Sequence, residues 1–303
     1  MSVTEHSNPA STLVDIPHAV RRPRSLHGVV RQWPALLSLV MLSLVLLAAL
    51  FPQALSPHEP FQQNLVARLQ PPAWLDGGDW TYPLGTDQLG RDVLTRIIYG
   101  ARISLAVGIS AVVISGLLGV ILGLVAGFYG GWVERLITRL IDTQLAIPRI
   151  LLAVSIIAVL GQGVTNVILV LGFAGWMVYA RVVRAQVLSV KAKEYILAAR
   201  CLGASNRSLM LRHILPNVTS PIIIIASVSV AANIILESSL SFLGLGAGVT
   251  AISWGTMLAD SRSYITTHGW LPTFPGLAIM YTVFAVNLFG DWLRDYMEPL
   301  LRR

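Results

Sequence analysis

Charged side chains are scarce in this chain of 303 residues, since Asp, Glu, Lys and Arg make up only 12% of it. Soluble domains carry about twice that share. The chain has one cysteine, Cys201, which excludes an intrachain disulfide framework and a metal site built from several cysteines. Hydrophobic residues make up 54% of the chain, and the mean hydropathy is +0.68. This composition indicates a polytopic membrane protein.

Several catalytic and binding patterns are also missing. The only lysines, Lys191 and Lys193, do not follow a GxxxxGK[ST] run, so the chain has no P-loop for ATP. It has no HExxH motif, and its six histidines are scattered. No apolar span carries a Ser/His pair, paired aspartates or a relay of charges, which argues against a membrane enzyme and a proton-coupled pump. The net charge of +7 comes from short loops between apolar spans, which favours membrane topology over nucleic-acid binding.

Six apolar stretches approach the roughly 20 residues that a bilayer-spanning helix needs. They are residues 34–52, 103–127, 146–162, 164–183, 217–240 and 272–290. The first stretch is longer than the apolar core of a cleaved signal, about 7–15 residues, so we expect it to be retained. None of the stretches is a broken, polar midplane helix of the kind that secondary transporters use, so a secondary transporter or channel is the less favoured alternative.

The placement of Lys and Arg predicts the orientation. With the N-terminus in the cytoplasm, inner segments hold 17 of the 22 basic residues and outer segments hold 5. The positive-inside rule then predicts that both termini are cytoplasmic, in agreement with an even number of spans. In this topology Arg135, Arg139 and Arg149 lie in an inner loop, and residues 53–102 and 241–271 lie outside.

Gly119, Gly123 and Gly127 form two overlapping GxxxG patterns in the second stretch. Glycines four residues apart share one helix face and let another backbone approach closely. The pattern favours helix packing within the chain, and the alternative is a contact with another subunit or with the translocation path.

Polar residues mark the outer ends of two spans. We expect Thr86 or Asp87 to cap a helix that begins near Val93. The helix would then have a polar outer face formed by Arg91, Asp92 and Arg96. Glu237 lies near Asn233 at the outer end of the fifth stretch; an intramembrane acid is a functional candidate by default, but the adjacent serines favour a solvated or structural role.

The most informative segment is the polar, basic interruption before the fifth stretch. Its spacing predicts one amphipathic helix over residues 190–202. Gly203 would end this helix, Ser205 would cap a second short helix, and Pro216 would open the next span. The first helix carries small residues at Ala198, Ala199, Gly203 and Ala204. Such a helix suits a groove on another protein, and it equally suits an anionic lipid surface, so the residues alone leave both readings open.

From about residue 34 onward, the chain resembles the second permease subunit of the dipeptide, oligopeptide and nickel ABC importers. Five blocks carry the resemblance in the right order: residues 84–105, 194–205, 212–217, 237–246 and 289–295. Residues 71–78 resemble the dipeptide branch in particular. The substrates expected from this resemblance are first dipeptides, then longer peptides, and after these nickel chelates or other small solutes.

The resemblance implies an all-α membrane protein with six transmembrane helices, the MetI-like type I ABC-importer transmembrane domain. Residues 1–33 would be a cytoplasmic tail, 34–52 the first transmembrane helix, 53–102 an external segment and 103–303 the permease domain, with a cytoplasmic coupling (EAA) loop at 185–216. The location implied is the bacterial inner membrane. The chain itself would not be an enzyme and would hold no cofactor or metal.

The partners implied are a homologous second permease subunit, two ABC ATPase subunits that bind ATP and Mg²⁺, a periplasmic or extracellular solute-binding protein, and membrane lipid. The residues expected to couple the chain to an ATPase are Glu194, Tyr195, Ala198, Ala199, Arg200, Gly203 and Ala204. Cys201 stands where relatives commonly have alanine.

Overall fold

The computed structural model describes residues 33–248 and 250–301, so the predicted cytoplasmic tail falls outside the described residues except for Trp33. Residues 34–303 form one unit. The described residues contain helices and one isolated bridge, between Thr86 and Asp92, but no strand. The helices in chain order are α2 (Trp33–Leu50), α3 (Pro52–Leu55), η1 (Leu65–Ala67), α4 (Val93–Tyr129), α5 (Gly131–Leu145), α6 (Arg149–Leu160), α7 (Val164–Lys191), α8 (Glu194–Cys201), α9 (Asn206–Ser208), η2 (Leu209–Ile214), α10 (Leu215–Phe242), α11 (Trp254–Ser261), η3 (Arg262–Tyr264) and α12 (Trp270–Leu301).

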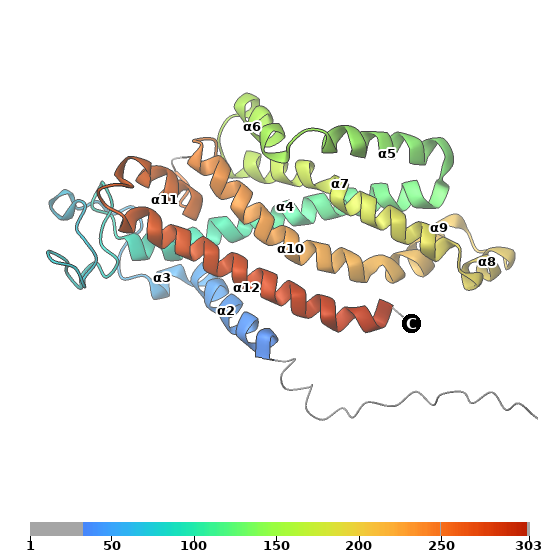
Figure 1. The fold of residues 1–303 in the computed structure, drawn as a ribbon, viewed down its shortest axis with the longest axis horizontal. Helices are drawn as coiled ribbons and strands as arrows, with labels where there is room; N and C mark the ends of the chain where they lie inside the picture. Colours follow the sequence, from blue (N-terminus) through green and yellow to red (C-terminus); the bar gives the residue numbers. More distant parts are fainter. Residues whose placement is uncertain (1–32, 249, 302–303) are drawn as a thin grey trace, which may run out of the picture. The chain divides into compact units, whose positions relative to one another are not determined.

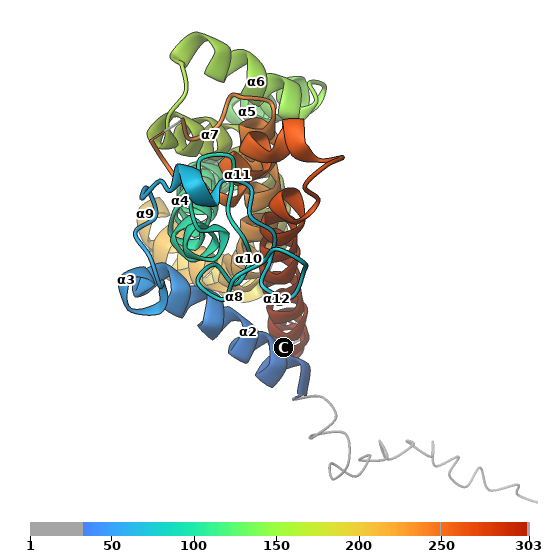
Figure 2. The ribbon, with the colours of Figure 1, turned by 90° about the vertical axis from the view of Figure 1, so that its left-hand side faces the viewer.

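The long helices run side by side between two ends of the unit (Figure 1). One end, the α11 end, holds α11, α3 and the irregular segment 53–92, and Figure 2 looks onto it. The opposite end, the α8 end, holds α8 and α9. Within the described residues, five helices are long and apolar enough to cross a membrane, or six spans if a bent pair is counted as one. The predicted all-α membrane fold is therefore confirmed.

The third span is the bent pair, and its predicted bounds of 146–162 are wrong. α6 has only 12 residues and meets α5 at an angle of 88°. The bend falls at Pro148, because proline disfavours helical geometry in the residue before it. α5 carries a charged face that includes Arg135 and Arg139, and for this reason the sequence predicted a loop here. The helix nevertheless packs on α4 and α7 through Ile137 and Ile141. The expectation that the chain has no broken helix is also wrong.

α4 and α7 share the most extensive helix contact of the unit, and the three spaced glycines lie in it. A Cβ at Gly119 would lie 2.3 Å from the carbonyl oxygen of Trp176, and one at Gly123 would lie 2.6 Å from that of Ala180. At Gly127, a Cβ would lie 2.7 Å from a side-chain carbon of α7. Since real Cβ atoms do not approach so closely, glycine lets these two backbones touch. The structure thus places the three glycines in a contact within the chain.

α4 begins at Val93, as predicted, but its N-cap differs from the expectation. Neither Thr86 nor Asp87 caps it; the carboxylate of Asp92 accepts two backbone N–H groups of the first turn. Asp87 instead pairs with Arg91 at 2.6 Å and with Arg96 at 2.5 Å. The expected polar outer face is wrong, because Asp92 and Arg96 are buried, with exposed fractions of 3% and 4%. Arg96 turns inward because it pairs with Asp87 and with Asp260 of α11, and Asp92 turns inward because it caps the helix.

Glu237 joins α10 to the start of α11. Its side chain is fully buried, so the solvated role is wrong. Its Oε1 atom accepts hydrogen bonds from the hydroxyls of Ser241 at 2.8 Å and Ser253 at 2.7 Å. Ser253 is also the N-cap of α11. The acid therefore has a structural position that fixes a short helix at the α11 end.

Candidate functional site

The segment between α7 and α10 forms the α8 end of the unit (Figure 1). The prediction of one helix over residues 190–202 is wrong, because α7 continues to Lys191 and α8 begins only at Glu194. Lys193 has an extended backbone, with φ −72° and ψ 143°, and it separates the two helices. The ammonium group of Lys191 donates to the carbonyl oxygen of Phe128 at 2.5 Å, so the last turn of α7 is held against α4.

One side of α8 is anchored to the rest of the chain. Ile196 is fully buried and belongs to an apolar cluster with Leu209 and Ile214 of η2 and with residues of α4 and α7. Ala199 and Ala204 are partly buried against the same cluster. These two alanines, predicted among the coupling residues, therefore face inward and support the helix.

The other side of α8 is exposed. Tyr195 is 43% exposed and Leu197 is 50% exposed, and Leu202, just beyond the helix, is 89% exposed. The other exposed residues of this surface are Glu194, Ala198, Arg200, Cys201 and Gly203. Of the seven predicted coupling residues, five thus lie on the open side. Leu202 was not among the predicted coupling residues; it is the C-cap residue of α8, directly before Gly203.

A Schellman motif ends α8 and sets the direction of the chain beyond it. The N–H of Gly203 donates to the carbonyl oxygen of Arg200 at 3.0 Å, and that of Ala204 donates to Ala199 at 3.1 Å. Gly203 has φ +83°, a conformation that side-chain-bearing residues rarely adopt. The predicted helix-breaking role of Gly203 thus has a backbone cause, because a Cβ there would meet no atom within 4 Å.

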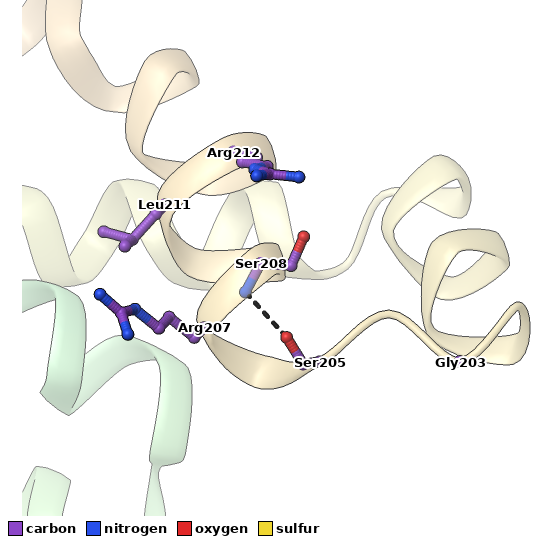
Figure 3. Close-up of a pocket in the computed structure, with 6 residues that line it drawn as sticks. All are labelled: Gly203, Ser205, Arg207, Ser208, Leu211 and Arg212. Carbon is purple, nitrogen blue, oxygen red and sulfur yellow. Dashed lines mark hydrogen bonds between the residues drawn. The ribbon is translucent and has the colours of Figure 1, made fainter.

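Beyond the motif, the chain folds around an open basic hollow (Figure 3). Ser205 caps the short helix α9 by accepting the N–H of Ser208 at 3.3 Å, as predicted. The predicted proline at the start of the next span is present in the first turn of α10. The hollow has a volume of about 640 Å³, and its lining is Gly203, Ser205, Arg207, Ser208, Leu211 and Arg212.

The combination of an apolar exposed helix face and a basic hollow is suited to binding another molecule. Among the described residues, no three His, Cys, Asp or Glu side chains come together as metal ligands would. The apolar face on an anchored helix fits helix-in-groove recognition of a protein. The adjacent arginines Arg207 and Arg212 favour a partner with acidic groups.

Two family models match the chain. Residues 119–303 match the "Binding-protein-dependent transport system inner membrane component", and residues 27–72 match the "N-terminal TM domain of oligopeptide transport permease C". The chain belongs to the binding-protein-dependent transport permeases. The resemblance to ABC-importer permeases that five sequence blocks carry is thereby confirmed.

Relatives of this permease match over most of their length. The di/tripeptide transport system permease protein of Pseudomonas aeruginosa (strain UCBPP-PA14) is 43% identical over 268 residues, 88% of each chain. The dipeptide transport system permease protein of Escherichia coli (strain K12) is 43% identical over 277 residues, 91% of this chain and 92% of its own. The oligopeptide transport system permease protein of Bacillus subtilis (strain 168) is 37% identical, over 89% of this chain and 86% of its own.

A solved structure supports the fold. A chain of the inward-facing MetNI methionine ABC transporter superposes with a TM-score of 0.56 at 17% identity, covering 66% of this permease and 95% of that chain. This permease therefore has the MetI-like ABC-importer fold, is homologous to dipeptide and oligopeptide ABC permeases, and is a multi-pass inner-membrane protein.

Proposed function

We propose that this permease forms half of the translocation path of an ABC importer for dipeptides and oligopeptides. The relatives named for peptide transport, at 37–43% identity over most of the chain, support this substrate class. A homologous permease subunit would supply the other half of the path. A solute-binding protein would deliver the peptide, and two ATPase subunits would bind ATP and Mg²⁺. This chain would be a non-catalytic subunit, in line with its relatives, which are named as transport permease proteins.

The exposed face of α8 on its anchored base is the observation that supports coupling to an ATPase. A helix transmits force only if it cannot slide on its own protein, and the buried Ile196 holds α8 to α4, α7 and η2. Its outward residues, Glu194, Tyr195, Ala198, Arg200 and Gly203, would contact the ATPase, together with Leu202. Ala199 and Ala204 would act from within by keeping the helix in place.

The mechanism we propose is alternating access. ATP binding would close the ATPase dimer and move α8 with the helices to which it is packed, so that the path opens outward to receive a peptide. Hydrolysis would restore the inward-facing state. Each ligand shifts the equilibrium by as much as it prefers one of the two states. The α8 end and both termini would then lie in the cytoplasm, as the distribution of basic residues predicts.

Cys201 offers a direct test, since it is exposed on α8 and is the one cysteine of the chain. A photoactivatable crosslinker attached to Cys201 in native membranes should capture an ATPase subunit, identified by mass spectrometry. The matched control carries Cys201→Ala and Thr81→Cys, which moves the probe to an exposed position in the segment 53–92 of the α11 end. Capture of lipid alone from Cys201, or equal capture of an ATPase from both positions, would contradict the docking role. Uptake of radiolabelled dipeptide by proteoliposomes with the binding protein and ATP tests the substrate.

A further inference from the structure

The break in the third span leaves a helix N-terminus with free donors. α6 begins at Arg149, directly after Pro148, and within the described residues no side chain caps it. Its first backbone hydrogen bond runs from the N–H of Leu152 to the carbonyl oxygen of Pro148 at 3.1 Å. The N–H groups of Arg149, Ile150 and Leu151 therefore have no partner within the helix. Such an end also carries the positive pole of the helix dipole.

The side chain of Arg149 adds a positive charge that no acid in the described part of the chain neutralises. Its Nη2 atom donates to the Oδ1 atom of Asn233 at 2.7 Å and to the carbonyl oxygen of Leu171 at 3.3 Å. Both acceptors are neutral. A guanidinium has five N–H donors, so about three remain, on Nε and Nη1. The Nε atom is buried, and it has no hydrogen-bond partner among the described residues.

Asn233 contributes another unused donor at the same place. Its side chain is fully buried on α10, and its Oδ1 atom is taken by Arg149. Its Nδ2 atom is buried and finds no partner in the described residues. A buried polar group without a partner destabilises the fold. The break therefore gathers donors from a guanidinium, an amide and a helix N-terminus, beside the buried hydroxyl of Tyr179. Donors of this kind bind an anion.

The cluster lies at mid-depth of the helix bundle, so the prediction that Arg149 lies in an inner loop is wrong. Leu171 is 7 residues from the start of α7, and Asn233 is 9 residues from the end of α10. At a rise of about 1.5 Å per residue, these positions are roughly 11 and 14 Å from the α11 end of their helices. The hydrocarbon core is about 30 Å thick, and a charged residue at this depth is a functional candidate by default.

The break is open on one side. Ile147 is 44% exposed and Leu151 is 57% exposed. Next to it, an apolar groove of about 500 Å³ begins at Ile150 and extends across α10 to α11 and α12. A molecule with an anionic end and apolar side chains would thus find apolar surface beside the break, with the buried donors of Arg149 and Asn233 behind it.

We propose that the α5–α6 break, with Arg149 and Asn233, transiently binds the terminal carboxylate of a peptide in passage. The inference rests on the proposed function of peptide import. A carboxylate fits a guanidinium fork in a bidentate manner, and an amide and helix N–H groups replace the water that it loses. Broken helices of other transporters also direct a half-helix N-terminus at an anionic group of the substrate. Because Arg149 is the one cationic side chain of this site, the site would bind a carboxylate weakly enough to let the peptide leave.

The test compares a free peptide carboxylate with an amide. Proteoliposomes that hold the complete importer are supplied with saturating binding protein loaded with either Ala-Phe or Ala-Phe amide, so that delivery is equal. We expect wild type to transport Ala-Phe at least tenfold faster than the amide. In Arg149→Gln this ratio should fall to near 1, and Arg149→Lys should keep part of it. The matched control is Arg139→Gln, an exposed arginine of α5, which should keep the wild-type ratio.

Each outcome decides between this proposal and a purely structural role. An unchanged ratio in Arg149→Gln, or slower uptake of both peptides by the same factor, would overturn the carboxylate site. Equal rates in wild type would overturn it while leaving peptide import intact. No uptake of either peptide by wild type would refute the proposed function and the site with it. If Arg149→Gln does not assemble, the ratio of Ala-Phe uptake to Ala-Phe amide uptake is measured in Asn233→Ala instead. This ratio should fall toward 1.

Discussion

Replacing Gly203 should uncouple transport from ATP hydrolysis by straining the end of α8. Gly203 has φ +83°, and a Cβ at this position would have no atom within 4 Å. Alanine would therefore meet no steric clash, and it would affect the end of α8 only by straining the backbone. The left-handed conformation costs a residue with a side chain roughly 1–2 kcal/mol. A free-energy cost of this size lowers the population of the conformation with the Schellman motif at the end of α8 by a factor of about 5–30. Asparagine tolerates this conformation better, so Gly203→Asn should lose less than Gly203→Ala.

The assay is ATP-driven dipeptide uptake by proteoliposomes, normalised to the amount of assembled complex. Gly161→Ala is the matched control, because Gly161 also follows a helix, has φ +84° and has no atom within 4 Å. It lies at the end of α6, away from α8. We expect uptake to fall about fivefold or more in Gly203→Ala, to fall less in Gly203→Asn, and to stay near wild type in Gly161→Ala. Equal effects of the two alanine variants would refute the idea that the end of α8 transmits force.

Three other substitutions test how the helices hold together. Gly123→Val should lower the thermal midpoint of the complex in detergent, because a Cβ would lie 2.6 Å from the carbonyl oxygen of Ala180 and overpacking costs about 1–3 kcal/mol. Arg96→Gln should lower the free energy of unfolding by about 3 kcal/mol, because it leaves the buried carboxylate of Asp87 with one partner fewer. This loss should also appear as a lower thermal midpoint. Ile196→Ala should cost about 2–5 kcal/mol locally and loosen α8, so the ATPase subunits should be lost on co-purification while membrane insertion persists. Normal thermal midpoints for the first two, or full ATPase recovery for the third, would contradict the packing described.

The features that the sequence predicts well are local. Long apolar runs predict membrane helices because crossing a bilayer depends on length and hydropathy. Ser205 as a cap and Gly203 as a helix stop follow from residues within three positions of each. Recognition of the permease family from five short blocks depends only on residue identity and order.

The failures involve helix packing, ion pairs and backbone geometry that residue type and spacing do not reveal. The α5 face that carries Arg135 and Arg139 has the composition of a loop, and only packing against α4 and α7 makes it part of a span. The charges of Asp92 and Arg96 suggest an exposed helix face, but ion pairs to the preceding loop bury Arg96, and capping buries Asp92. The prediction of one helix over residues 190–202 overlooked the extended backbone at Lys193.

The class of this protein, an all-helical ABC-importer permease, follows from its residues alone, because membrane insertion and family identity are properties of local composition and order. Helix packing determines which side of α8 is open, and the folded chain shows that the third span is broken. It also brought the donors of Arg149 and Asn233 together across 84 residues of chain. The physical reason is that burial and hydrogen bonding depend on which helices pack together, and no local pattern specifies a neighbour so far away.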